Sequence, residues 1–155
     1  MKTLYLLRHG KSSWDNQKLS DFNRSLNNRG TKEAKELAEY MANNRYIPEI
    51  ILCSSAKRTR ETLEPILEAL EFGGEVKYLE NLYLASAYVI GEVINSVNAE
   101  TLLVVGHNPG IEDYLSKLVG EELNMKTCHL AVIDFENKIL KDFLRPKDFQ
   151  SEVKK

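Results

Sequence analysis

The sequence has few cysteines and no long apolar run. Its two cysteines, Cys53 and Cys128, lie far apart in 155 residues, and neither a disulfide framework nor a paired metal-binding motif is readable from them. The longest strongly apolar runs, such as 102–105, fall far short of the roughly 20 residues that span a membrane. We therefore expect reduced thiols and no membrane-spanning segment.

The chain also lacks an excess of charge of one sign. Lys and Arg together number 21 and Asp and Glu 23, which gives a net charge of −2. Such a protein has no overall cationic field for nucleic acid or an anionic membrane, so any attraction for phosphate must be local. Arg8 ends the apolar stretch 4–7 before it reaches the length of a secretion signal. The sequence predicts a cytoplasmic protein with no nucleic-acid or membrane partner.

Length and composition favour a single domain. The chain is long enough for one hydrophobic core and too short for two ordinary domains. It contains no internal repeat, low-complexity tract or linker. We expect one domain at 1–145 and a polar, frayed tail at 146–155.

Short apolar runs alternate with longer stretches of helical spacing, which is typical of a sheet covered by helices. Strands are predicted at 2–7, 49–53, 76–79 and 101–105, with a closing hairpin at 130–135 and 139–144. Helices are predicted at 27–44, capped by Asn27 or Asn28, at 86–95, from Pro109 to 119, and from a cap at Ser54 or Ser55 to about 70. We expect a three-layer α/β/α domain whose mostly parallel sheet has 101–105 at its centre.

Chemically active side chains follow three of these strands. Arg8-His9-Gly10 comes directly after the first strand, Arg58 begins the helix after the second, and Gly106-His107-Asn108-Pro109-Gly110 follows 101–105. In open α/β sheets, ligands bind at the carboxyl ends of the strands. The sequence therefore predicts that two histidines and two arginines meet at one edge of the sheet.

This residue set suits a phosphoryl group. Two guanidinium groups on different strand ends can neutralise most of a phosphoryl dianion without a metal. The helix dipole opposes a cation at a helix amino terminus, so Arg58 is favoured there when it binds an anion. A neutral imidazole between the arginines can then act as the nucleophile. We predict phosphoryl-transfer chemistry at this edge.

The same segments resemble the histidine phosphatase superfamily, whose phosphoglycerate mutase-like members share an R-H-G motif and a second catalytic histidine. The chain is most similar to the short, SixA-type phosphohistidine phosphatases, over about residues 1–145. The similarity lies in the order and spacing of four runs: R-H-G-K-S-S-W-D-N (8–16), D-F-N-R-S-L-N-N-R-G (21–30), S-S-A-K-R-T-R-E-T (54–62) and G-H-N-P-G (106–110).

The resemblance implies a phosphoglycerate mutase-like fold and a phosphohistidine intermediate on His9. It implies that Arg8, Arg58 and His107 form the phosphate pocket and that the enzyme needs no metal or other cofactor. Ser12 falls where related enzymes place a hydroxyl group near the phosphate. We expect Asn108, in the same turn as His107, to contact the substrate as well.

Two acidic positions bear on the reaction that the resemblance implies. Asp15 stands where the mutases have an asparagine that touches phosphate. A carboxylate repels that ligand, so we give Asp15 no binding role. The difference argues against a mutase. Glu80, three residues before Tyr83, matches the mutase general acid and is the candidate acid here. An alkoxide leaving group needs such a proton, whereas phosphohistidine can release a neutral imidazole.

The short segment between Glu80 and the strand at 101 predicts an uncovered pocket, since mutases of this superfamily carry insertions there. An open site suits a phosphorylated side chain on a protein and favours hydrolysis over transfer. We expect a metal-independent phosphatase acting on protein phosphohistidine. The alternatives are a phosphomonoesterase acting on a small phosphorylated metabolite and a non-catalytic module that binds a phosphorylated ligand. The oligomeric state stays open.

Two other hydrolase chemistries fit the sequence poorly. Cys53 precedes Arg58 as in a cysteine phosphatase, but only four residues separate them, none is glycine, and Cys53 still belongs to the predicted strand. A metal site built from His9, His107 and Asp15 would place a cation beside two arginines, and no His-x-x-x-His or paired-carboxylate spacing supports it.

Overall fold

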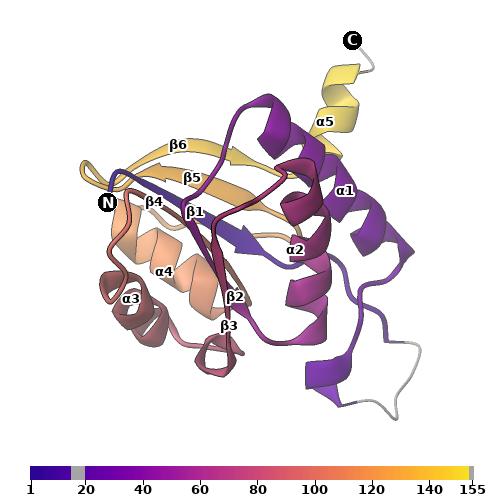
Figure 1. The fold of residues 1–155 in the computed structure, drawn as a ribbon, viewed down its shortest axis with the longest axis horizontal. Coiled ribbons are helices and arrows are strands. Elements are labelled where there is room, and N and C mark those ends of the chain that lie inside the picture. Colours follow the sequence, from indigo (N-terminus) through magenta and orange to yellow (C-terminus); the bar gives the residue numbers. More distant parts are fainter. Residues whose placement is uncertain (15–19, 154–155) are drawn as a thin grey trace.

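Six strands form one sheet in the order β3-β2-β4-β1-β5-β6 in the computed structural model, which describes residues 1–14 and 20–153 (Figure 1). The strands are β1 (Thr3–Arg8), β2 (Ile50–Ser54), β3 (Glu75–Leu79), β4 (Thr101–Gly106), β5 (Leu130–Asp134) and β6 (Ile139–Leu144). The first four are parallel, whereas β5 and β6 form an antiparallel hairpin at one side. The predicted α/β class and mostly parallel sheet are confirmed.

Strand β4 lies between β1 and β2, as its apolar sequence predicts. Its residues from Leu102 to Gly106 are all buried, because helices cover both faces of a parallel sheet. Arg8 on β1 pairs with Gly106 on β4, and Cys53 on β2 pairs with Val105. This register brings the carboxyl ends of β1, β2 and β4 to the same edge.

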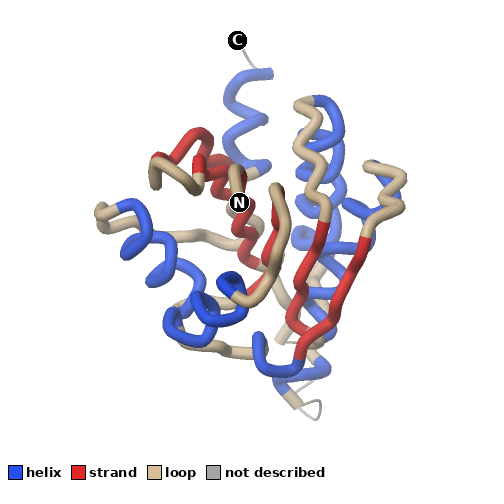
Figure 2. Tube along the Cα trace, turned by 60° about the vertical axis from the view of Figure 1, so that its left-hand side comes forward, coloured by secondary structure: helices blue, strands red, loops and turns tan. Residues whose placement is uncertain are grey.

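Two layers of helices enclose the sheet (Figure 2). Helices α1 (Asn28–Asn43) and α2 (Lys57–Ala69) pack on one face, and α3 (Ala87–Asn95) and α4 (Gly110–Val119) pack on the other. Each buries residues at helical spacing, for example Leu37 and Met41 on α1 and Ile111 and Leu115 on α4. The three-layer arrangement thus follows from the apolar periodicity.

The beginning of α2 differs from the prediction. The helix starts at Lys57, Ala56 occupies the N-cap position, and no side chain caps it. Ser54, one of the two expected caps, is still part of β2, where it pairs with Leu79. Its hydroxyl group is therefore held at the carboxyl end of β2.

The expected frayed tail is wrong for its first part, because residues Pro146–Val153 form a helix, α5. The ring of Phe149 stacks on Tyr40 of α1, with centroids 4.7 Å apart and planes 12° apart. Phe149 also packs against the core beneath α1. Phe149 thus packs this helix against the domain.

Among the described residues, no helix has both the length and the apolar character needed to cross a membrane.

Candidate active site

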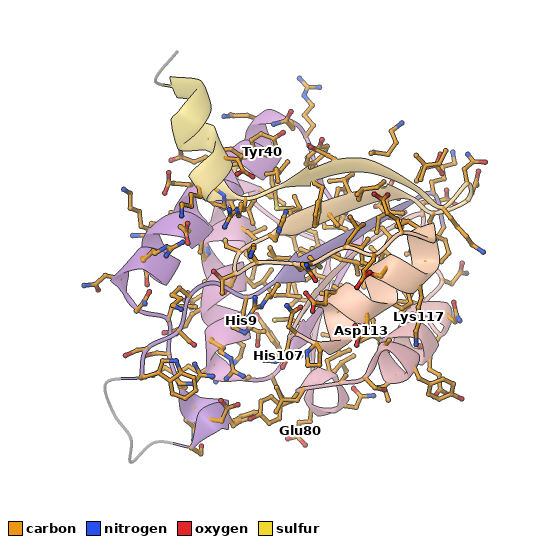
Figure 3. All side chains as sticks on the ribbon, turned by 180° about the vertical axis from the view of Figure 1, so that it is seen from behind. His9, Tyr40, Glu80, His107, Asp113 and Lys117 are labelled. Atoms are coloured by element: carbon orange, nitrogen blue, oxygen red, sulfur yellow. The ribbon has the colours of Figure 1, made fainter. Side chains whose placement is uncertain are left out.

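The ends of β1, β2 and β4 bring the predicted residues together at one edge of the sheet (Figure 3). Arg8 ends β1 and His9 follows it, Ser54 ends β2, and His107 follows β4. The rings of His9 and His107 lie 5.3 Å apart, centroid to centroid. Two segments about 100 residues apart in sequence thus meet as the topology requires.

A cavity of about 310 Å³ opens at this edge. It is lined by six of the seven predicted site residues, and four of its lining side chains carry a positive charge. The lining consists of Arg8, His9, Lys11, Ser12, Trp14, Asp21, Arg24, Arg58, Leu84, His107, Asn108 and Thr127. The structure therefore supplies the local cationic field that the overall charge of −2 does not.

The orientation of His9 leaves one ring nitrogen free to react. Its Nδ1 lies 2.7 Å from the carbonyl oxygen of Gly10, which only accepts, so Nδ1 carries the proton and donates it. The lone pair consequently resides on Nε2, which accepts a long hydrogen bond of 3.4 Å from Nε of Arg58. His9 is 7% exposed, enough for Nε2 to meet a ligand in the cavity.

His107 is held in the other tautomer. The Arg58 guanidinium donates from Nη2 to Nδ1 of His107 at 3.3 Å, so Nδ1 is the acceptor. Nε2 then carries the proton and donates it to the Ser54 hydroxyl oxygen at 2.7 Å. Sequence reasoning assigned Ser54 a helix cap, whereas the structure shows that it orients this imidazole.

Both histidines are neutral near pH 7. Burial lowers the pKa of His9 to about 3; the hydrogen bond to Gly10 opposes this effect, and the positive charges of Arg58 and Arg8 add to it. Burial also lowers the pKa of His107 to about 4, with Arg58 as the next cause. A bound dianion would raise both pKa values, because it favours the protonated imidazole.

Arg58 occupies the centre of the site. It is 2% exposed, and its guanidinium contacts both histidine rings. Nη1 donates to the backbone oxygen of Asp21 at 2.7 Å, and Nη2 donates to the Asp21 carboxylate at 3.0 Å. These contacts fix the guanidinium plane between the two imidazoles.

Arg8 and Asn108 share a network at the other wall of the cavity. Arg8 Nη1 donates to the backbone oxygen of Met125 at 3.0 Å, and Asn108 Nδ2 donates to the same oxygen at 2.8 Å. Asn108 Nδ2 also donates to Glu112, which in turn accepts from the Met125 backbone. Burial lowers the pKa of Arg8, and the Glu112 charge partly offsets that effect. Glu112 therefore organises both residues without lining the cavity.

This wall of the cavity holds one buried donor and one buried acceptor that are both unpaired. Arg8 Nε and Asn108 Oδ1 are both buried, and neither has a hydrogen-bond partner in the structure. A phosphoryl oxygen can accept from Arg8 Nε. The Asn108 amide nitrogen is already engaged with Glu112 and Met125, so its contribution is to shape the wall.

Ser12 lies in the cavity, as the resemblance implies, but its hydroxyl group is not isolated. It accepts a hydrogen bond from Arg24 Nη1 and is largely buried. Arg24 also donates from Nη2 to Asp21 at 2.7 Å. Ser12 and Arg24 thus form one unit with Asp21.

Asp21 is the central charged residue among those of the site that sequence reasoning missed. It belongs to a short 3-10 helix, η1 (Asp21–Asn23), which follows no strand, and its carboxylate accepts from Arg24, Arg58 and the Tyr83 hydroxyl group. Desolvation alone would raise the pKa of Asp21, but the hydrogen bonds from Tyr83 and Arg24 and the charge of Arg58 hold it below its ordinary value. Asp21 is therefore ionised at neutral pH.

The candidate acid Glu80 is not brought into the cavity. It begins a second 3-10 helix, η2 (Glu80–Leu82), its side chain is exposed, and it does not belong to the cavity lining. Figure 3 shows Glu80 at the periphery, away from His9. Tyr83, the residue after η2, reaches the site instead, where its hydroxyl group donates a hydrogen bond to the Asp21 carboxylate. Asp15 lies outside the described residues.

A close backbone approach fixes the loop after η2. A Cβ atom on Gly110, the first residue of α4, would lie 1.7 Å from the backbone oxygen of Ala85. Only glycine lets the α4 terminus and the 83–85 loop touch in this way. The contact places Tyr83 edge-on to His107, with centroids 5.4 Å apart.

The cysteine alternative has no nucleophile in this cavity, whereas His9 and His107 of the metal alternative line it and its Asp15 lies outside the described residues. Burial raises the pKa of the Cys53 thiol to about 12, and Cys53 does not line the cavity. Within residues 1–14 and 20–153, no three His, Cys, Asp or Glu side chains are grouped as a metal ion would require.

Residues 4–83 match the sequence profile of the histidine phosphatase superfamily (branch 1). An uncharacterized chloroplastic protein of Arabidopsis thaliana is 31% identical over 143 residues, which cover 85% of this chain and 66% of that protein. This chain thus spans just under two thirds of that relative's length.

Solved structures match nearly the whole chain. A crystal structure from Agrobacterium tumefaciens that carries the name phosphohistidine phosphatase SixA is 34% identical, with a TM-score of 0.87 over 92% of this chain and 97% of the other. The protein histidine phosphatase SixA complexed with tungstate is 19% identical, with a TM-score of 0.83 over 95% and 99%. A phosphoserine phosphatase mutant from Entamoeba histolytica bound to phosphoserine is 16% identical, with a TM-score of 0.70 over 92% and 96%. The last two show a shared fold.

Proposed function

Because this chain belongs to the histidine phosphatase superfamily and is of the SixA type, we propose that it hydrolyses phosphohistidine on proteins through a phosphohistidine intermediate on His9. In this proposal Arg8 and Arg58 bind the phosphoryl oxygens, and His107 and Asn108 complete the pocket with Ser12. No metal ion or other cofactor takes part.

One observation carries the proposal: His9 presents an unprotonated Nε2 to a cavity with four cationic side chains. The Gly10 carbonyl group fixes the tautomer, and the lowered pKa keeps the ring neutral. A neutral imidazole can attack phosphorus, and the guanidinium beside it stabilises the charge on the equatorial oxygens.

The reaction has two displacements. In the first, the lone pair of His9 Nε2 forms a bond to phosphorus while the bond to the leaving group breaks, and that electron pair departs with the leaving atom. In the second, a water oxygen bonds to phosphorus, the pair of the P–Nε2 bond returns to His9, and one water proton passes to phosphate or solvent. The Nδ1–H donated to Gly10 stays in place throughout.

Asp21 bears on the leaving group. It is the carboxylate among the described residues that line the cavity, and it is ionised, so it has no proton to give. An alkyl phosphate needs an acid to protonate its leaving oxygen. Phosphohistidine protonated on its other ring nitrogen leaves as neutral imidazole without one. The site is therefore better matched to a P–N bond than to an alkyl ester.

The SixA name of the Agrobacterium tumefaciens structure supports the same substrate class, since that protein is 34% identical over nearly the whole chain. The phosphoserine phosphatase from Entamoeba histolytica makes phosphate esters the competing substrate class. A phosphomonoesterase acting on a small metabolite is thus the second candidate, and a binding module without turnover is the third.

The test compares turnover of a phosphohistidine protein, phosphoramidate, a phosphoserine peptide and small phosphate esters in the presence of EDTA. We expect P–N substrates to be preferred and a 32P label from them to be trapped on His9 after rapid acid-free quenching. His9→Ala should remove both turnover and label, whereas His129→Gln, which changes a buried histidine outside the cavity, should keep them.

Each result decides between the candidates. Preference for esters would favour the phosphomonoesterase, and binding without turnover would favour the module. Activity that survives in His9→Ala would reject the nucleophile, and inhibition by EDTA would reject a metal-free reaction.

A further inference from the structure

Two exposed apolar side chains stand at the mouth of the cavity. Trp14 is 69% exposed and Leu84 is 53% exposed, and both line the same cavity as His9. They come from segments 70 residues apart in sequence. Large apolar groups in solvent cost free energy unless a ligand covers them, and tryptophan is enriched where binding energy concentrates.

Trp14 is held in place although it is exposed. The guanidinium carbon of Arg24 lies 3.7 Å from the centroid of its ring, a cation–π contact. Arg24 is in turn fixed by Asp21 and Ser12. The indole is therefore attached to the same network that holds Arg58, and it presents its remaining surface to solvent.

Leu84 lies in the loop after η2, where its backbone is held in an unusual conformation. Its φ is 50°, a left-handed conformation that a leucine adopts only at a cost. The neighbours explain the constraint, because Tyr83 is hydrogen-bonded to Asp21 and Ala85 is buried against Gly110. The strained backbone directs an apolar side chain to the cavity mouth, where a glycine or asparagine would relieve the strain.

The cavity thus has a cationic interior and an apolar mouth. A phosphoryl group fits the interior, beside Arg8, Arg58 and the histidines. Trp14 and Leu84 line the same cavity and are exposed, so a group attached to the phosphoryl group can contact them. A small polar metabolite buries little apolar surface there, whereas a polypeptide can place apolar side chains on either side of its phosphorylated residue.

We propose that Trp14 and Leu84 form a docking rim for a polypeptide segment in which apolar residues flank the phosphorylated side chain. This inference rests on the proposed function and goes beyond it, since it names residues that select the sequence around the phosphorylated position. The rim leaves the chemistry to the cavity interior, so it should affect protein substrates and spare phosphoramidate.

The experiment uses two histidine peptides phosphorylated chemically, identical except that leucines or glycines flank the phosphorylated residue. We expect wild-type kcat/KM to favour the leucine peptide by about tenfold, as burial of one or two apolar side chains implies. Trp14→Ala and Leu84→Asn should each cut that preference to under about threefold. Asparagine tolerates the left-handed backbone, so Leu84→Asn removes the apolar group without adding strain.

Two controls separate the rim from folding and from catalysis. Ile139→Asn removes an equally exposed side chain, 53%, on β6 outside the cavity, and should keep the full preference. Trp14→Phe keeps an aromatic surface and should retain most of it. Phosphoramidate, which has the P–N bond and no organic group, reports any effect of a rim variant on the cavity interior, and its kcat/KM should fall much less than that of the leucine peptide.

Trp14 also offers a direct readout, because it is the chain's single tryptophan. In the His9→Ala background, its fluorescence should shift to shorter wavelength when a peptide carrying a non-hydrolysable phosphohistidine analogue binds. Inorganic phosphate should leave the emission maximum in place.

The outcomes distinguish this inference from the proposed function. No turnover of phosphoramidate by the wild type would overturn the proposed function itself. Normal phosphoramidate turnover with equal kcat/KM for the two peptides, or a leucine preference that survives both rim substitutions, would overturn the docking rim alone. Peptide binding measured by calorimetry with unchanged emission would also overturn it.

Discussion

The Asp21 carboxylate lies 3.0 Å from Nη2 of Arg58, so the guanidinium at the centre of the cavity is already paired with a negative charge. This pairing fixes Arg58 against the two histidines, and it also sets a carboxylate beside the place where a dianion must bind. Asp21 therefore orients the arginine at some expense in phosphate affinity.

Replacing Asp21 with asparagine should tighten phosphate binding. Asparagine keeps an oxygen acceptor for Arg58 and removes one negative charge, and because the Asp21 side chain is partly exposed, the gain is about three- to tenfold. The measurement is the competitive inhibition constant of inorganic phosphate. Asp113→Asn, which removes an exposed carboxylate outside the cavity, is the control. Weaker phosphate binding would mean that the orientation of Arg58 by the Asp21 carboxylate contributes more to affinity than the repulsion between that carboxylate and phosphate removes.

The three histidines predict a loss of stability as pH falls. Burial lowers the pKa of His9 to about 3 and the pKa values of His107 and His129 to about 4. In the unfolded chain they titrate near 6.5, so below that pH the unfolded state binds protons that the folded state refuses. The unfolding free energy should therefore decrease between pH 6.5 and 4, by at most about 1.4 kcal/mol per pH unit for each histidine.

Urea unfolding at pH 7, 6 and 5 checks this dependence. His129→Gln should remove one histidine's share of the slope, since glutamine can still accept from the Lys126 backbone as His129 does. A stability that stays constant from pH 7 to pH 5 would contradict the lowered pKa values.

Substituting Glu80 tests the acid assignment. Because Glu80 is exposed and outside the cavity lining, Glu80→Gln should change kcat/KM by less than about twofold for both phosphoramidate and a small phosphate ester. The two substrates are measured side by side. A selective loss with the ester would reinstate Glu80 as the general acid and would imply that the η2 segment moves inward when substrate binds.

The sequence was sufficient for most of the fold. Apolar runs located all six strands, the position of β4 followed from its burial on both faces, and the phosphoglycerate mutase-like arrangement expected from the resemblance is confirmed. The two incorrect predictions, the Ser54 cap and the frayed tail, failed because contacts between residues distant in sequence decide the structure there. Ser54 is not a cap because its pairing with Leu79 extends β2, and the tail is helical because Phe149 stacks on Tyr40.

Some residues of the site could be predicted from the sequence, and others could not. His9, Arg58 and His107 follow strands, so the rule that ligands bind at strand ends located them. Asp21 belongs to the short η1 helix and not to the turn directly after a predicted strand, so the strand-end rule did not place it opposite Arg58. A buried arginine such as Arg58 needs a negative partner. The acidic residue of the D-F-N-R run, Asp21, was the sequence feature that could have indicated this partner.

Gly110→Ala should destabilise the protein although it adds a good helix former. Alanine gains at most about 1 kcal/mol of helix propensity at this first helical position, but its Cβ would lie 1.7 Å from the Ala85 backbone oxygen, and relieving such a clash costs more than that gain. We expect a net loss of about 2 kcal/mol in urea unfolding and weaker phosphate binding, because the displaced loop carries the tyrosine that contacts Asp21. Gly91→Ala, which meets only the Tyr114 side chain, at 3.3 Å, should stay within about 1 kcal/mol of wild type. Equal stability of the two variants would show that the loop is free to move away from α4 and does not hold the site in shape.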